Sequence, residues 1–278
     1  DARPSMTPTL TPPLPPALPH YTGRQYSAPP EVHMSSPSSS VQVRQHELVI
    51  PSAPVKPGRL PLIGRAGQDR PVHPYRPLAD IEFGRLAPRT FRALTLENEF
   101  LRLTVLPELG GRLHRAVYKP AHYDLFYHND AIRAQLISSR GAWYAGGVEF
   151  NFPISHSLTT HAGVEYATRQ LPDGSAAIIV SNTCRMSRMR WEVAIRIAPG
   201  SSAINFQTRL INRTAWPQRY YYWLNAAVPQ GPQIRYHFSA SKLIGHTQEV
   251  DGTVTRLDSF PIMRNGADAR VPARLPDT

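Results

Sequence analysis

The sequence contains a single cysteine, only three lysines and no long apolar run. Because Cys184 is the only cysteine in 278 residues, the chain can form neither an internal disulfide nor a zinc site built from several thiolates. No apolar run reaches the roughly 18 residues of a membrane-spanning helix, so we expect no membrane segment. We predict no cofactor and no metal ion. The sequence does not identify the cellular compartment of the protein, with the cytoplasm slightly favoured.

The net charge is +11, and almost all of the basic residues are arginines. A nucleic-acid-binding chain usually gathers its basic residues on one element. Here the arginines are spread along the chain, and the tightest group is Arg185, Arg188 and Arg190. We therefore do not expect a nucleic acid as partner.

Proline is concentrated near the start, where 18 of the 29 prolines fall within residues 1–90. Residues 1–40 are rich in proline and serine, a composition that buries too little apolar surface to offset the entropy lost on ordering. We predict a disordered leader over 1–40. A proline-rich segment that docks a protein partner is the alternative.

The rest of the chain shows segments with a period of two, and no segment has a convincing helical period of 3.6 residues. Leu101, Leu103 and Val105, for example, alternate with polar residues. Strands are predicted at 41–50, 95–106, 112–118, 124–127, 166–170, 176–180, 190–197, 203–211 and 219–228. This pattern predicts an all-β domain with antiparallel sheets, curved or sandwiched.

The strand pattern weakens beyond about residue 240. We assign 41–246 to the β domain and 247–278 to a divergent or disordered tail. A sandwich of this kind would normally need more strands to close its core. We therefore expect the domain to be incomplete at the C-terminal end and the chain to be part of a longer protein.

Residues 140–165 combine flat apolar side chains with many polar ones. The aromatic residues are Trp143, Tyr144, Phe150 and Phe152, and the polar ones are Arg140, Glu149, Asn151, His156, His161 and Glu165. Apolar walls with a few placed polar groups are typical of a small-molecule site. Gly146 and Gly147 would let another chain or a ligand approach the backbone. The alternative is a buried strand followed by a polar loop.

Four motifs in a fixed order carry a family resemblance. They are Leu106-Pro-Glu-Leu-Gly-Gly-Arg-Leu113, Arg140-Gly-Ala-Trp143, Gly146-Gly-Val-Glu-Phe-Asn-Phe-Pro153 and Tyr221-Tyr-Trp-Leu-Asn-Ala-Ala-Val228. Over about 41–245 the sequence resembles a bacterial domain-of-unknown-function family that is placed with the galactose mutarotase-like (aldose 1-epimerase-like) proteins. The resemblance implies a β-supersandwich with a carbohydrate-facing groove on its concave sheet. Longer members of that family carry tetratricopeptide repeats after the domain.

The sequence departs from true sugar epimerases in two places. Gly146-Gly147, Phe152-Pro153 and His161 follow the epimerase order. The segment that would supply a second histidine, 221–225, holds aromatic residues instead, and the sequence stops before the strand that would carry the late carboxylate base. Simple mutarotation by a His/carboxylate pair is therefore not expected.

Chemistry at an anomeric centre would need an acid and a base on either side of a sugar. Glu149 is the candidate acid, because desolvation between Val148 and Phe150 would raise its pKa. The alternative is an ion pair between Glu149 and Arg140 or Arg112. His156 and His161 are the candidates to assist Glu149 by donating a hydrogen bond to the ring oxygen or the glycosidic oxygen of the sugar. The separation of Glu149 from a second carboxylate, Glu165, is left open, and the spacing of His156, His161 and Glu165 matches no metal-binding pattern.

The expected sugar contacts are of two kinds. Trp143, Tyr222 and Trp223 would stack on a sugar ring, although filling the core is the alternative for each. Hydrogen bonds to hydroxyls are expected from Arg112, Arg140, Asn151 and Asn225. The sequence thus predicts a carbohydrate-binding or carbohydrate-active domain, with the reaction left open. The alternative is a non-catalytic structural or interaction domain of a larger repeat-containing protein.

Overall fold

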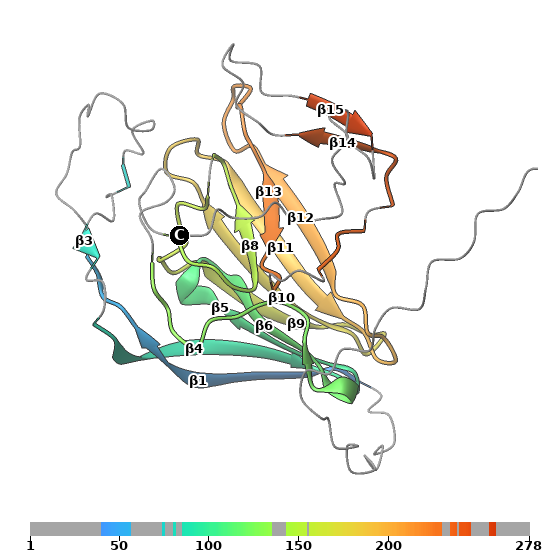
Figure 1. Ribbon diagram of the computed structural model, residues 1–278. Helices are drawn as coiled ribbons and strands as arrows, with labels where there is room; N and C mark the ends of the chain where they lie inside the picture. The colour runs from blue at the N-terminus through green and yellow to red at the C-terminus, as the bar shows by residue number, and fades with distance from the viewer. Residues whose placement is uncertain are drawn as a thin grey trace, which may run out of the picture. The chain divides into compact units, whose positions relative to one another are not determined.

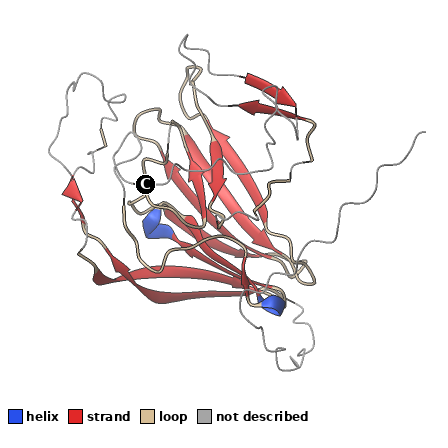
Figure 2. Cartoon of the chain, in the orientation of Figure 1, coloured by secondary structure: helices blue, strands red, loops and turns tan. Residues whose placement is uncertain are grey.

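The structure is a computed structural model of the chain. It describes residues 40–56, 74–75, 80–81, 85–134, 143–154, 156–229, 234–237, 239–245 and 256–259. These residues are almost entirely strand and loop, with two short 3-10 turns, η1 (Pro107–Leu109) and η2 (Lys119–Ala121), drawn in blue in Figure 2. None of the helices among them has the length and hydrophobicity needed to cross a bilayer. The all-β prediction is confirmed.

The larger sheet has seven strands. Its order is β1-β4-β5-β6-β8-β13, and the short β7 also pairs with β6 (Figure 1). All of these pairings are antiparallel. The strands are β1 (Gln42–Ser52), β4 (Ala87–Glu97), β5 (Leu101–Leu106), β6 (Arg112–Tyr118), β7 (Tyr123–Asp124), β8 (Val148–Asn151) and β13 (Trp223–Ala226).

The second sheet has four antiparallel strands in the order β12-β11-β10-β9. They are β9 (Glu165–Gln170), β10 (Ala176–Thr183), β11 (Arg190–Ile197) and β12 (Asn205–Ile211). Two further two-stranded ribbons join β2 (Val55–Lys56) to β3 (Asp80–Ile81), and β14 (Lys242–Gly245) to β15 (Arg256–Ser259).

The main core lies between the two sheets, and period-two alternation explains which residues enter it. Leu101, Leu103 and Val105 of β5 are fully buried, while Arg102 between them is exposed. The second sheet contributes Trp191, Val193, Ile195 and Ile197 from β11, as the sequence pattern predicts. The all-β domain is therefore a sandwich of two antiparallel sheets.

The seven-stranded sheet has a second, outer face, turned away from this core. A smaller apolar cluster covers part of it and consists of Ile50, Phe91, Ala93, Leu106, Leu109, Ile132 and Tyr144. Other positions of this face carry polar side chains, among them Arg44 of β1, Thr95 of β4, Thr104 of β5, Arg112 of β6, Glu149 of β8 and Asn225 of β13. Because the main core is buried by the second sheet, this outer face is where polar groups can converge.

Some element boundaries differ from the expected ones. The segment 95–106 is a hairpin of β4 and β5, with the turn around Asn98. β13 spans only Trp223–Ala226 of the expected 219–228. One strand, β15, lies within 247–278, although most of that range, like the expected leader 1–40 apart from Ser40, lies outside the described residues.

Candidate functional site

The pairing of β8 with β13 brings four predicted site residues to one face. Val148 and Phe150 of β8 enter the main core, so Glu149 and Asn151 point to the outer face. In the β8–β13 register Glu149 lies opposite Asn225, and Asn151 lies opposite Trp223. Directly opposed residues of antiparallel strands share a face. Trp223 and Asn225 therefore stand beside the two β8 residues.

Arg112 reaches the same face from β6. Its neighbour Leu113 lies opposite Val148 and is in the main core, so Arg112 points outward. Its Nη2 lies 3.2 Å from Glu149 Oε1, and both side chains are 3 % exposed. Nη2 makes no aligned hydrogen bond, so the contact is an ion pair. Its guanidinium also lies 4.0 Å from the centroid of the Tyr144 ring.

Arg112 also holds the Gly146–Gly147 turn. Its Nη1 donates to the carbonyl oxygen of Gly146 at 2.6 Å. Gly147 has φ +63, and a Cβ there would lie 2.0 Å from the carbonyl oxygen of Leu113. The close backbone approach that the glycine pair indicates is therefore to β6.

Three neutral or weakly basic donors complete the surroundings of Glu149. His156 Nδ1 lies 2.9 Å from Oε2, and Trp143 Nε1 donates to the same oxygen at 3.2 Å. Thr160 Oγ1 donates to Oε1 at 2.9 Å. Together with Arg112, these groups satisfy both carboxylate oxygens.

The pKa of Glu149 is lowered from its ordinary value. Burial by itself raises the pKa, but the hydrogen bond with His156, the charge of Arg112 and the hydrogen bond from Thr160 outweigh it. The prediction that desolvation would raise this pKa toward that of a general acid is therefore wrong. The alternative, an ion pair with Arg112, is what the structure contains.

Aromatic rings form a row beside the carboxylate. The ring centroids of Trp143 and His156 lie 5.4 Å apart, and those of His156 and Trp223 lie 4.9 Å apart. Tyr221 extends the row at 6.1 Å from Trp223. His156 is 21 % exposed, and Tyr221 is 46 % exposed. The row is thus only partly covered by protein.

An amide pair borders this row. Asn151 Nδ2 donates to Asn225 Oδ1 at 2.9 Å, and the Ser157 backbone N–H donates to Asn151 Oδ1 at 2.8 Å. Asn151 is fully buried, whereas Asn225 is partly exposed. Trp223 Nε1 is buried without a hydrogen-bond partner. We call the group Trp143, His156, Trp223 and Asn225 the aromatic–amide surface.

Other predicted residues lie elsewhere. Tyr222 packs against the main core, and its hydroxyl lies 2.7 Å from Thr208 Oγ1 of β12. His161 meets the Tyr144 ring edge-on at 5.5 Å. Glu165 pairs with Arg190 at 2.6 Å. Arg140 lies outside the described residues.

The sequence interpretation missed Thr160. Its hydroxyl oxygen lies 2.9 Å from Glu149 Oε1 and 2.8 Å from the carbonyl oxygen of Ser157, so its single O–H is shared between two acceptors. The signal for it is the hydroxyl-rich run 157–160, because serine and threonine side chains commonly stabilise such turns. Within the described ranges, no three His, Cys, Asp or Glu side chains are placed to hold a metal ion. Stacking rings and amide groups can instead hold a polar organic ligand.

The fold is similar to a known crystal structure. That protein is a TPR-domain containing protein from Parabacteroides distasonis ATCC 8503, with a TM-score of 0.71 and 23 % sequence identity. The match covers 83 % of this chain but 38 % of that one, so the chain spans well under half the length of its structural relative.

A family model also matches residues 68–268, which is more than half of the chain. The match extends past residue 245, where the sequence resemblance was expected to end, and includes β14 and β15. The chain therefore belongs to the family described as a domain of unknown function (DUF5107).

Proposed function

We propose that the aromatic–amide surface binds a carbohydrate. The observation that carries this proposal is the partly exposed row of Trp143, His156 and Trp223 on one sheet face, next to the Asn225 amide. Aromatic faces pack against the C–H face of a sugar ring, while amides and imidazoles bond its hydroxyls. Trp223 Nε1 adds a donor with no partner among the described residues.

Glu149 supports this surface rather than reacting. Its carboxylate is held ionised and occupied by Arg112, His156, Trp143 and Thr160. With Glu149 ionised, the His156 Nδ1–H is the donor in their contact, and in a neutral imidazole Nε2 is then an acceptor. An enzymatic version of the function would use this nitrogen for proton transfer, with Glu149 as the orienting group.

The proposal includes a specific fold type for the sandwich, the galactose mutarotase-like supersandwich. A galactose mutarotase-like supersandwich would carry its sugar groove on the concave sheet. The aromatic–amide surface lies on the outer face of the seven-stranded sheet, and this position supports that interpretation.

Calorimetric titration of the full chain with neutral oligosaccharides, after a glycan-array screen, tests the proposal. Trp143→Ala and Trp223→Ala should each weaken binding by at least about tenfold. Trp216→Ala is the matched control, because Trp216 is 73 % exposed and outside the row. Absence of any sugar binding, or an equal loss of sugar affinity in all three variants, would contradict the proposal.

Binding and turnover can be separated with His156→Gln. A catalytic His156 predicts that the variant binds sugar but no longer converts it, as followed by NMR of the anomeric protons. A binding-only domain predicts no conversion by either form. Conversion that survives in His156→Gln would contradict the assigned role of Nε2.

The second candidate is a non-catalytic interaction domain. Apolar side chains are exposed along and around β13, which is an edge strand: Tyr220, Tyr221, Leu224 and Val228 are each more than 40 % exposed. The structural relative is described as a TPR-domain containing protein. Sedimentation velocity with and without Leu224→Ser tests self-association through this edge. A pull-down that loses its partner when 1–40 is deleted would identify the leader as a docking segment.

A further inference from the structure

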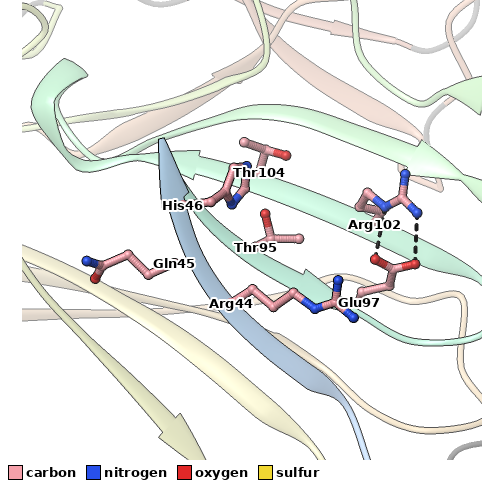
Figure 3. Close-up of a pocket in the computed structure, with 7 residues that line it drawn as sticks. All are labelled: Arg44, Gln45, His46, Thr95, Glu97, Arg102 and Thr104. Atoms are coloured by element: carbon pink, nitrogen blue, oxygen red, sulfur yellow. Dashed lines mark hydrogen bonds and ion pairs between the residues drawn. The ribbon is translucent and has the colours of Figure 1, made fainter. Parts of the chain in front are cut away.

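The outer face of the seven-stranded sheet also carries a polar groove. It has a volume of about 540 Å³. Its lining side chains come from β1, β4 and β5 (Figure 3), which lie on the opposite side of β6 from β8 in the strand order. That volume is within the range of small-molecule sites. The lining residues are Arg44, Gln45, His46, Thr95, Glu97, Arg102 and Thr104. We call it the β1–β5 groove.

Positive charge exceeds negative charge in and beside this groove. Glu97 is held by Arg102 through two hydrogen bonds of 2.9 and 3.0 Å, and by Lys119 at 2.9 Å. Burial alone raises the pKa of Glu97, but these hydrogen bonds and charges lower it to about 2. One carboxylate is thus shared by two cations. An excess positive charge remains before Arg44 is considered.

Arg44 adds a guanidinium with no acidic partner. It is exposed at the groove, and its Nη2 donates to the neutral Gln42 Oε1 at 2.5 Å. Within the described part of the chain, no carboxylate lies within ion-pair distance of Arg44. A guanidinium fork presents paired N–H donors that match the oxygens of a carboxylate or sulfate.

Two threonines supply hydroxyls between the arginines. Thr95 of β4 lies opposite Thr104 of β5 in the strand register, so both point to the outer face. Thr95 is 5 % exposed, yet its Oγ1 has no hydrogen-bond partner. A buried hydroxyl without a partner is costly, and an acceptor atom in the groove would satisfy it.

We propose that the β1–β5 groove binds the anionic group, a carboxylate or a sulfate, of an acidic saccharide through Arg44 and Thr95. The inference rests on the proposed carbohydrate binding in naming a saccharide as the carrier. It adds the substrate class: a sugar chain with acidic groups, held by the aromatic–amide surface and the β1–β5 groove on the same sheet face.

Matched ligands test this with the full chain. Tri-galacturonate is compared with its methyl ester, and sulfated lactose with lactose, by calorimetry at one ionic strength. At least one acidic ligand should bind about tenfold or more tightly than its neutral partner, and that pair identifies the source of the anion. Arg44→Ala should lower affinity for that acidic ligand by about 10- to 100-fold and leave the neutral ligand unchanged.

Two further variants keep the test specific. Arg169→Ala removes the same charge from an exposed position of β9 in the other sheet and should leave both affinities unchanged. Thr95→Val should weaken acidic-ligand binding several-fold without lowering the melting temperature, because it removes an unsatisfied hydroxyl.

Equal binding of acidic and neutral ligands would overturn the inference, and so would equal losses in Arg44→Ala and Arg169→Ala. In either case the proposed function stands if neutral sugars still bind through Trp143 and Trp223. Loss of binding to every saccharide would end both proposals.

Discussion

At the scale of the residue, Glu149 contacts four side chains from three segments of the chain. Its carboxylate meets Arg112 of β6, Trp143 before the glycine turn, and His156 and Thr160 after β8. A buried carboxylate is tolerated only when its charge and lone pairs are matched. The position of the aromatic row therefore depends on one acidic side chain.

Replacing that carboxylate should destabilise the fold. Glu149→Gln leaves the buried charge of Arg112 unmatched, and we expect a loss of about 3 kcal/mol in the free energy of unfolding, measured with urea. The control is Glu165→Gln, whose carboxylate is 64 % exposed and pairs with Arg190. That pair should be worth less than about 1 kcal/mol. Similar small losses in the two variants would contradict the assigned role of Glu149.

His114 should make stability depend on pH. Burial, followed by the positive charges of His128, Arg112 and Arg115, lowers its pKa from 6.5 to about 4. As pH falls below 6.5, the unfolded chain takes up the proton before the folded chain, so stability is lost between pH 6.5 and about 4. The loss from pH 7 to 5 should be about 2 kcal/mol.

The variant that tests this is His114→Gln, compared by urea unfolding at several pH values. It should remove most of the slope between pH 7 and 5, whatever its absolute stability. The exposed His237→Gln should keep the wild-type slope. A slope that persists in His114→Gln would assign the effect to another group.

At the scale of the element, the β6–β8 contact depends on Gly147. It has φ +63, and a Cβ would lie 2.0 Å from the Leu113 carbonyl oxygen, a backbone atom that cannot move aside cheaply. We expect Gly147→Ala to lower the melting temperature strongly or to prevent folding. Gly163→Ala is the control, because no atom lies within 4 Å of its added Cβ. Near-equal melting temperatures for the two variants would contradict this account.

Strand positions could be predicted well where one face is buried. β6 and β11 begin and end where alternation indicates, because the main core selects every second residue. The expected strand 219–228 is reduced to β13. Tyr220 and Tyr221 have high strand propensity, but they lie outside the pairing with β8 and are exposed. Propensity does not show where a partner strand ends.

The turn at Asn98 was also beyond sequence interpretation. Its Oδ1 accepts from the backbone N–H groups of Phe100 and Leu101 at 2.9 and 2.7 Å. Its Nδ2 donates to Ala198 and Ser201, about a hundred residues away, and links the β4–β5 hairpin to the second sheet. Only the three-dimensional fold brings these carbonyl groups to it.

At the scale of the whole molecule, the site could be predicted in composition but not in geometry. Residues 140–165 contain Trp143, Glu149 and His156, and the motif comparison adds Trp223 and Asn225. The pairing of β8 with β13 is what places them on one face. Tyr222, one position from Trp223, points to the opposite face because strand side chains alternate. The pKa of Glu149 is lowered by His156, Arg112 and Thr160, which lie 7 residues after, 37 before and 11 after it in the sequence.

The four tryptophans of the chain allow sugar binding at the aromatic–amide surface to be measured directly. Trp143 and Trp223 lie in that surface, Trp191 is buried in the main core and Trp216 is exposed outside the row. The full chain labelled with 5-fluorotryptophan is titrated with the saccharide that binds most tightly and followed by fluorine NMR. We expect the Trp143 and Trp223 resonances to shift with one common dissociation constant while those of Trp191 and Trp216 stay in place. Shifts confined to Trp216, or equal shifts at all four tryptophans, would contradict sugar binding at this surface.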